Sequence, residues 1–185
     1  LAVIGTVNGV NFTDGLDGLA TGVTTMVAVF FTAVSIGLGG GIEPITAAVT
    51  GALLGFLLFN VYPAQVFMGD TGSLTIGGII AVFAIIIHKE LLIPILCGVF
   101  LVENLSAILQ RVYYKLGKRK GVKQRLFKRA PIHDHFRTSM SLIEPGCTVK
   151  FTKPDQLFHE SKITVRFWIV TIVLAAITII TLKIR

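Results

Sequence analysis

Five long blocks of mostly apolar residues limit the folds that are open to this sequence. A helix that crosses the roughly 30 Å hydrocarbon core of a bilayer needs about 20 such residues. The pattern therefore predicts an all-α fold, a polytopic transmembrane helix bundle with about five spans. The blocks cover residues 18–38, 44–62, 72–88, 90–110 and 163–183, and residues 1–8 look like the remnant of a sixth span.

The composition agrees with a membrane location. Only 15% of the 185 residues are charged and the mean hydropathy is +0.79, whereas an ordinary soluble domain carries about 25% charged residues. A soluble globular domain is thereby excluded, and residues 1–185 are expected to form a single integral membrane domain. The sequence opens with Leu1 inside an apolar pattern and without a signal sequence, so we expect the chain to be the C-terminal part of a longer protein.

The positive charges predict the orientation of the spans. Of the 17 Lys and Arg residues, 14 lie between Arg111 and Arg166, and connections rich in Lys and Arg stay in the cytoplasm. Residues 111–162 are therefore predicted to form a basic cytoplasmic loop. Because the spans alternate in direction, three polar clusters are then expected at the same cytoplasmic face, where they can form one site. These clusters surround Asp14, Asp70 and His133.

The first cluster runs from Asn11 to Leu19 and contains two acids without a basic neighbour. Asp14 and Asp17 are three residues apart, so on a helical turn they share one face. An Asp near a helix start is often only a cap, but two acids beside Asn11 favour binding of a polar ligand or a cation. Asn60, at the end of the second apolar block, either binds a ligand or bonds a neighbouring helix.

The second cluster runs from Phe67 to Leu74 and places Asp70 between two glycines, which leave its carboxylate accessible. Thr71 or Ser73 is expected to cap the span that follows. The first turn of that span offers free N–H groups and the positive end of the helix dipole, which suit a phosphate. An Asp beside a phosphate indicates Mg²⁺, which is commonly held by one or two carboxylates plus substrate phosphates. The alternative is an ordinary capped turn.

The third cluster, from Pro131 to Phe136, follows a strongly basic run. His133 and His135 point the same way if the segment is extended, a spacing that also occurs in metal sites. A zinc site would need further ligands, and only His159 is at hand. We therefore interpret the two histidines as groups that contact phosphate or transfer protons. Upstream, Glu103 lies inside an apolar block and either serves the site or bonds a neighbouring helix.

The three motifs, in this order with apolar blocks between them, closely resemble the polyprenyl-phosphate N-acetylhexosamine-1-phosphate transferases. The Pro131–Ile132–His133 segment points to the phospho-N-acetylmuramoyl-pentapeptide transferase branch of that family. The resemblance implies Mg²⁺-dependent transfer of phospho-N-acetylmuramoyl-pentapeptide from UDP-MurNAc-pentapeptide to undecaprenyl phosphate, with release of UMP. This reaction makes the first lipid intermediate of peptidoglycan synthesis at the cytoplasmic face of the bacterial inner membrane.

The resemblance also implies roles for individual residues. Asp70 would bind the Mg²⁺, and Asn11 would be a further ligand or a nucleotide contact. His133 and His135 would contact phosphates, so that these two histidines and Asp70 are the catalytic candidates. The family usually has three consecutive histidines in the third motif, and Asp134 stands in the place of the middle one.

Substrate binding is assigned in the same way. By resemblance, Asp14 and Asp17 would line the uridine and diphosphate pocket, and Phe67 would stack on uracil. Further substrate-binding candidates are Asn60, Ser73 and Asp134. The family has an additional acidic pair and a lysine in its first half, neither of which is found here, so the chain alone is expected to be inactive.

Three alternatives stay open. The nearest is a sister enzyme that transfers GlcNAc-1-phosphate or another aminosugar phosphate for surface polysaccharide. A transporter is disfavoured, because its polar groups should lie near the bilayer midplane rather than at one face. A non-catalytic membrane assembly protein leaves Asp70 and the histidines without a purpose. The expected partners are the two substrates and membrane lipid, without nucleic acid, and a homodimer is left open.

Overall fold

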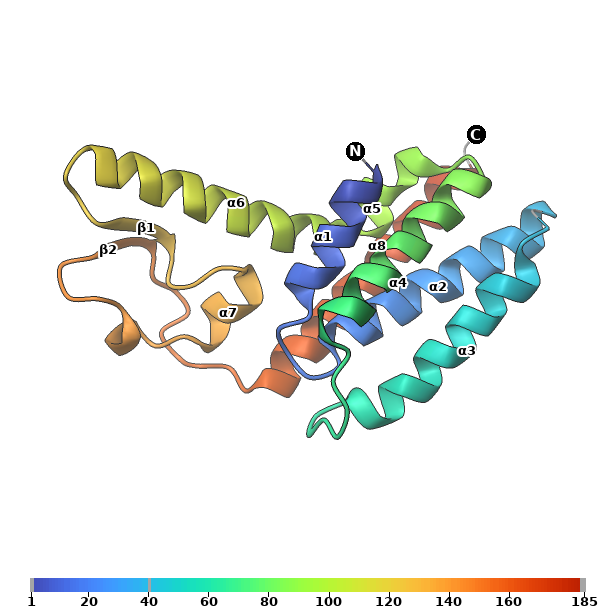
Figure 1. Ribbon diagram of the computed structural model, residues 1–185, viewed down its shortest axis with the longest axis horizontal. Helices are drawn as coiled ribbons and strands as arrows, with labels where there is room; N and C mark the ends of the chain where they lie inside the picture. Colours follow the sequence, from blue (N-terminus) through green and yellow to red (C-terminus); the bar gives the residue numbers. More distant parts are fainter. Residues whose placement is uncertain (1, 40, 184–185) are drawn as a thin grey trace.

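The computed structural model describes residues 2–39 and 41–183, and its regular secondary structure is almost entirely helical (Figure 1). This confirms the predicted all-α, polytopic class. The described helices are α1 (Ala2–Thr13), α2 (Leu19–Leu38), α3 (Glu43–Asn60), α4 (Gly69–Ile86), α5 (Ile93–Leu96), α6 (Gly98–Arg119), α7 (Ile132–Arg137) and α8 (Glu160–Lys183), with single 3₁₀ turns η1 (Glu90–Leu92) and η2 (Met140–Leu142). Two short strands, β1 (Gln124–Phe127) and β2 (Thr148–Phe151), pair in parallel.

Four helices, α2, α3, α4 and α8, are each long and apolar enough to cross a membrane. The predicted span over residues 90–110 differs, because it is broken near Cys97 into two helical pieces that are bent by 76°. Five spans result only if this bent pair counts as one. Pro94 lies at the start of α5, where it cannot donate a backbone hydrogen bond, and the helix restarts in a new direction at Gly98.

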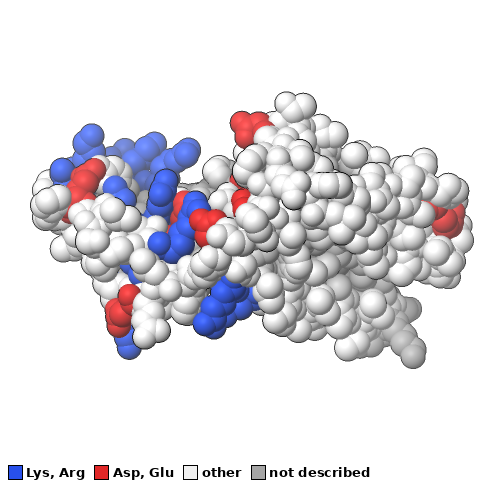
Figure 2. Space-filling view, turned by 90° about the horizontal axis from the view of Figure 1, so that it is seen from below, with Lys and Arg blue, Asp and Glu red and all other residues white. Residues whose placement is uncertain are grey.

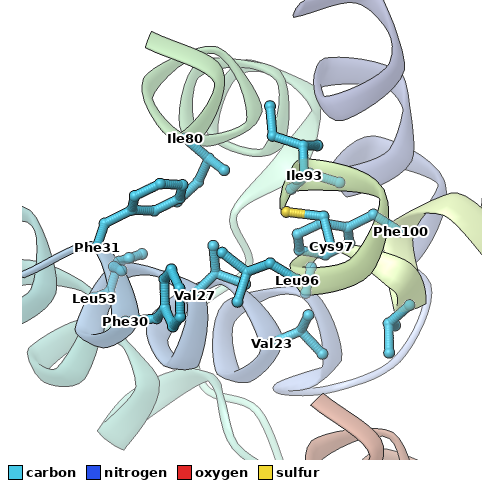
Figure 3. Close-up of a cluster of buried hydrophobic side chains, with 14 of the residues drawn as sticks. Val23, Val27, Phe30, Phe31, Leu53, Ile80, Ile93, Leu96, Cys97 and Phe100 are labelled. Carbon is cyan, nitrogen blue, oxygen red and sulfur yellow. The ribbon is translucent and has the colours of Figure 1, made fainter. Parts of the chain in front are cut away.

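Helix α2 forms the centre of the bundle and packs against α3, α4 and α8. Its inward face carries Val23, Val27, Phe30 and Phe31, which meet side chains such as Ile80 and Leu96 (Figure 3). By contrast, α3 and α8 leave most of their apolar side chains exposed. Apolar outer faces of this kind suit contact with lipid, where packing between helices rather than exclusion of water stabilises the bundle.

Glycines allow two helix pairs to approach closely. A Cβ atom placed on Gly77 of α4 would lie 2.7 Å from the Cα atom of Val7 on α1. A Cβ on Gly22 of α2 would collide with the indole of Trp168 on α8, whose Nε1 donates to the Gly18 carbonyl at 3.2 Å. The α1–α4 contact matters most, because it determines how the end of α1 meets the start of α4.

The part of the chain between α6 and α8 lies to one side of the bundle and carries 8 of the 17 Lys and Arg residues (Figures 1 and 2). The predicted loop over residues 111–162 begins too early, because α6 continues as a helix to Arg119. Strand β1 is held against α6 by Gln110, whose Oε1 accepts the N–H groups of Leu126 and Phe127 at 3.0 and 2.9 Å. The basic segment is therefore folded rather than a loose loop.

We predict that Gly77→Val destabilises the protein by about 1–3 kcal/mol, the usual cost of overpacking, because α1 must move away from α4. Gly51→Val is the matched control, since a Cβ on Gly51 meets no atom within 4 Å. Thermal unfolding in detergent measures both variants. An equal loss of stability in the two variants would contradict the α1–α4 contact.

Candidate functional site

Segments from all three polar clusters meet at one end of the bundle, where α1 ends, α2 and α4 begin and α7 approaches (Figure 1). Asn11 bonds Asp70, the charge of Asp70 acts on Asp14, and the ring of His133 lies directly against Gly15. The sequence predicted that these clusters share a face, and the fold brings them into contact. The roles assigned to the individual residues stay predictions.

Asn11 connects the first cluster to the second. Its Nδ2 group donates to Oδ1 of Asp70 at 3.1 Å and to Oγ of Ser73 at 3.0 Å. Ser73 is fully buried and donates in turn to the Gly69 carbonyl. Since both bonds of Asn11 use its nitrogen, its amide oxygen, which accepts no hydrogen bond from the described residues, is available beside the Asp70 carboxylate.

The start of α4 differs from the prediction. The helix begins at Gly69, before Thr71 and Ser73, and no side chain caps it. Hydroxyl groups on its first turns instead bond back to helix carbonyls, as Ser73 does to Gly69 and Thr75 does to Thr71. The first N–H groups of α4 therefore have no side-chain acceptor, which leaves them available to an anion beside Asp70.

The two acids of the first cluster point to different partners. The prediction that Asp14 and Asp17 share a helical face is wrong, because both lie in the turn between α1 and α2. Partial burial and the nearby charge of Asp70 raise the pKa of the Asp14 carboxyl above its usual value. Asp17 accepts the N–H of Ala64 at 2.9 Å. Asp14 therefore belongs with Asp70, whereas Asp17 holds the connection between α3 and α4 in place.

Two further candidates differ in how accessible they are. Asn60 is buried, accepts the hydroxyl of Thr21 and donates to the Val66 carbonyl at 2.9 Å. Its side chain closes the turn after α3, which argues against a contact with substrate. Phe67, in contrast, is 73% exposed and lies three residues before Asp70 in the sequence, so its ring is free to stack on a ligand.

The histidine segment is helical rather than extended, which separates its two imidazoles. On a helix, positions i and i+2 point to nearly opposite sides. Nδ1 of His133 lies 3.0 Å from Oε2 of Glu103 on α6, and its Nε2 faces Gly15, with Oδ1 of Asp134 at 3.6 Å. His133 is therefore directed toward the first cluster, as the prediction of a shared site requires.

His135 points the other way. Its Nδ1 accepts the N–H of Lys128 at 3.2 Å, and its Nε2 donates to the Lys153 carbonyl at 2.7 Å. Burial lowers the pKa of this imidazole, and the charge of Lys128 lowers it further against the opposing effect of the Lys153 carbonyl. A neutral ring with both nitrogens bonded to the backbone argues against the predicted contact with phosphate, and assigns His135 to the support of the basic segment.

Asp134 forms ion pairs with two arginines. Its carboxylate oxygens lie 2.7 Å from Nε of Arg137 and 3.2 Å from Nε of Arg129. Arg137 also pairs with Glu160 at the start of α8. Burial tends to lower the pKa of Arg137, but the hydrogen bonds and charges of these two acids outweigh it and raise the pKa. Asp134 thus anchors α7 to α8, which argues against the predicted substrate contact.

Glu103 is the hydrogen-bond partner of His133, which the sequence alone did not predict. It is fully buried in α6, and its Oε1 has no hydrogen-bond partner among the described residues, while Oε2 meets His133. An acid inside an apolar block is a functional signal, but nothing in the sequence connects it to a histidine thirty positions later. The pair fixes the ring of His133 and gives it an acceptor at Nδ1.

An apolar cavity of about 460 Å³ lies between α6, α7 and α8. Its walls include Val102, Phe136 and Phe158, and its one charged lining residue among the described side chains is Arg166. The Arg166 guanidinium stands 4.4 Å above the centre of the Phe158 ring. A cavity of this composition suits an aliphatic chain with an anionic group near Arg166.

The donor atoms at the bundle end fit Mg²⁺ better than a transition metal. Within the described residues, no three or more His, Cys, Asp or Glu side chains converge as a metal cage. Mg²⁺ does not need such a cage, because it retains water and binds one or two carboxylates together with substrate phosphates. Asp14 and Asp70 supply carboxylates that repel each other, and Asn11 supplies an amide oxygen beside them.

These features define a polytopic membrane protein with a polar site at one end of its helix bundle. Residues 1–88 match the family model described as glycosyl transferase family 4. The chain is 72% identical to the phospho-N-acetylmuramoyl-pentapeptide-transferase of Bacteroides thetaiotaomicron, in an alignment that covers 96% of the chain and 46% of that relative. Proteins of the same name from Phocaeicola vulgatus and Porphyromonas gingivalis are 61% and 52% identical over the same shares.

The chain therefore belongs to the phospho-N-acetylmuramoyl-pentapeptide transferase family, and it spans about half the length of the relatives that it matches.

We predict that Glu103→Ala lowers the free energy of unfolding by about 1–3 kcal/mol, because it leaves a buried N–H of His133 without an acceptor. Glu103→Gln, which keeps an acceptor oxygen, should cost less. Removing Glu103 and His133 together should cost less than the sum of the two single losses. Thermal unfolding in detergent gives all four values, and strict additivity would show that the two side chains are not coupled.

Proposed function

We propose that the protein carrying this chain transfers phospho-N-acetylmuramoyl-pentapeptide from UDP-MurNAc-pentapeptide to undecaprenyl phosphate, with release of UMP. The names of the relatives support phospho-N-acetylmuramoyl-pentapeptide as the transferred group. The contact that supports the chemistry most directly is the Asn11–Asp70 hydrogen bond beside Asp14, because it collects carboxylates and an amide at a free helix start. Such a site suits a diphosphate with its metal ion.

The reaction exchanges one phosphate oxygen bond for another. An oxygen of the acceptor phosphate attacks the sugar-linked phosphorus of the donor, and the bond to UMP breaks. Catalysis of this kind depends on positioning and on neutralisation of charge. Asp70, Asp14 and the amide oxygen of Asn11 would hold Mg²⁺, which when bound neutralises the diphosphate charge. The first N–H groups of α4 would donate to the phosphate oxygens.

His133 is the imidazole best placed to act on the phosphates. Glu103 accepts its Nδ1–H, which leaves Nε2 directed at the turn that carries Asp14. When protonated, Nε2 can donate to a phosphate oxygen, and when neutral it can accept a proton. Phe67 would stack on the uracil from its exposed position. The prenyl chain of the acceptor would lie in the apolar cavity, with its phosphate near Arg166.

The distribution of charge supports a site on the cytoplasmic face of the bacterial inner membrane. The Lys and Arg side chains gather over one half of the molecule (Figure 2), and the polar site lies where α7 of that half approaches the bundle (Figure 1). Regions rich in these residues stay in the cytoplasm. A soluble nucleotide donor made in the cytoplasm would then reach Asp70 without crossing the bilayer.

The proposal is tested with a chimera in which the 185 residues of this chain replace the matching part of the Bacteroides thetaiotaomicron relative. We expect release of UMP from UDP-MurNAc-pentapeptide, but not from UDP-GlcNAc, in the presence of undecaprenyl phosphate and Mg²⁺, and no release by the 185-residue chain alone. Turnover of UDP-GlcNAc would instead assign the chain to the sister activity. Absence of turnover with both donors would contradict the proposal.

In this chimera we predict that Asp70→Asn lowers kcat by roughly 10²–10³-fold, the usual effect of losing a group that stabilises transition-state charge. The melting temperature should change little, since Asp70 is exposed. His133→Ala should lower kcat far more than His88→Ala, the matched control on the exposed turn after α4. Equal effects of the two histidine variants would argue against a specific role for His133.

The raised pKa of Asp14 makes a further prediction about Mg²⁺. Repulsion from Asp70 and partial burial disfavour the charged form of Asp14, so Asp14→Asn should raise the melting temperature of the metal-free chimera and reduce the stabilisation that Mg²⁺ adds. Because Mg²⁺ competes with a proton for this carboxylate, its affinity should fall as the pH drops through the raised pKa. Thermal shift measured against Mg²⁺ concentration checks both effects, and an unchanged response to Mg²⁺ in Asp14→Asn contradicts them.

A further inference from the structure

A second cavity, of about 340 Å³, lies between α6, β1 and the segment just before α7. Three arginines line it: Arg111 from α6, Arg125 from β1 and Arg129 from the connection to α7. Tyr114 and Gln110 complete the polar part of the wall, and Phe12 from α1 closes the side nearest the candidate site. Figure 2 shows Lys and Arg side chains gathered over this half of the molecule, while the bundle is almost free of them.

The arginines are held in place by the fold rather than collected by chance. Gln110 binds both the N–H groups and a carbonyl of β1, which fixes Arg125 relative to Arg111. Arg129 is held by Asp134, with 3.2 Å between Nε and Oδ2. Gathering like charges around one cavity is unfavourable by itself, so three arginines that the fold brings to one cavity indicate that an anion binds among them.

The neighbouring acids do not neutralise the cavity. Asp134 is shared between Arg129 and Arg137. Glu144 lies 3.3 Å from Lys123 and 4.0 Å from Arg125, so it too is shared between two cations. Among the described residues, Arg111 forms no ion pair. The lining of the cavity contains no carboxylate, and a net positive charge faces its interior.

The cavity adjoins the candidate site but is separated from it by α1. Consecutive positions on a helix point about 100° apart: Asn11 faces α4, where it bonds Asp70, whereas Phe12 faces the arginine cavity. A ligand whose diphosphate lies at Asp70 would therefore meet these arginines with a second anionic group, farther along its length.

We propose that this arginine cavity binds a carboxylate of the donor's peptide, an inference that rests on the function proposed above. A peptide tethered at its amino end carries at least a terminal carboxylate, and guanidinium groups bind carboxylates through two parallel hydrogen bonds. The wall combines guanidiniums, a phenol and an amide with the apolar side chains of Phe12, Ala107, Ala130 and Pro131, which suits a peptide better than the acyl chain of an anionic lipid. Arg111 and Arg125 thus recognise the part of the donor that does not react.

The test compares two donors in the chimera: UDP-MurNAc-pentapeptide and the same donor with its peptide carboxylates converted to amides. For the unaltered chimera, amidation should raise KM roughly tenfold or more, as expected for loss of hydrogen bonds to charged groups. In Arg111→Gln/Arg125→Gln, KM for the natural donor should rise by a similar factor, and amidation should have little further effect. The value of kcat should stay near that of the unaltered chimera.

Lys118→Gln is the matched control, because it removes one exposed charge from the same helix without altering the cavity. Arg111→Gln alone repeats the test if the double variant unfolds, as judged by its melting temperature. The inference is overturned if the variants weaken both donors equally, if Lys118→Gln does the same, or if the only change is a lost response to anionic lipid in nanodiscs. If the unaltered chimera shows no turnover, the proposed function fails and this inference fails with it.

Discussion

The buried contact between Glu103 and His133 connects the two halves of this structure. Glu103 belongs to helix α6, inside the apolar part of the chain, and His133 belongs to the folded segment beside the bundle. Their 3.0 Å contact excludes water, because both side chains are almost completely buried. It draws α7 against Gly15, where no side chain larger than hydrogen fits. Together with the Arg137–Glu160 pair between α7 and α8, this contact sets the position of the histidine segment relative to the acids.

Sequence periodicity was sufficient for the straight spans and insufficient for the bent one. The blocks assigned to α2, α3, α4 and α8 match the helices within a few residues, because a helix that spans a membrane must be mostly apolar along its length. Hydropathy carries no information about the direction of a helix axis, so it could not predict the 76° bend near Cys97. Nor could the end of α6, since a helix that leaves the membrane continues with charged residues up to Arg119.

The candidate site, too, was predictable from the sequence in part only. That the three clusters share one face followed from counting spans, and the contact between Asn11 and Asp70 agrees with it. Which residue faces which could not be predicted, because it depends on local geometry. The Asn60 side chain forms hydrogen bonds with Thr21 and Val66, and sequence spacing alone does not predict either contact. His133 and His135 separate because their six-residue segment is a helix rather than a strand.

The separation of charge explains why the acids at the bundle end suit the Mg²⁺ proposed above. The sequence has 17 Lys and Arg residues against 10 Asp and Glu, yet no Lys or Arg among the described residues forms an ion pair with Asp14 or Asp70. Arg129 and Arg137 are instead bound to Asp134, and Arg125 is drawn toward Glu144. With these arginines bound to other acids, a proton or the proposed metal ion would relieve the repulsion between Asp14 and Asp70. An anionic ligand long enough to pass α1 would then be neutralised by a bound metal at one end and by arginines at the other.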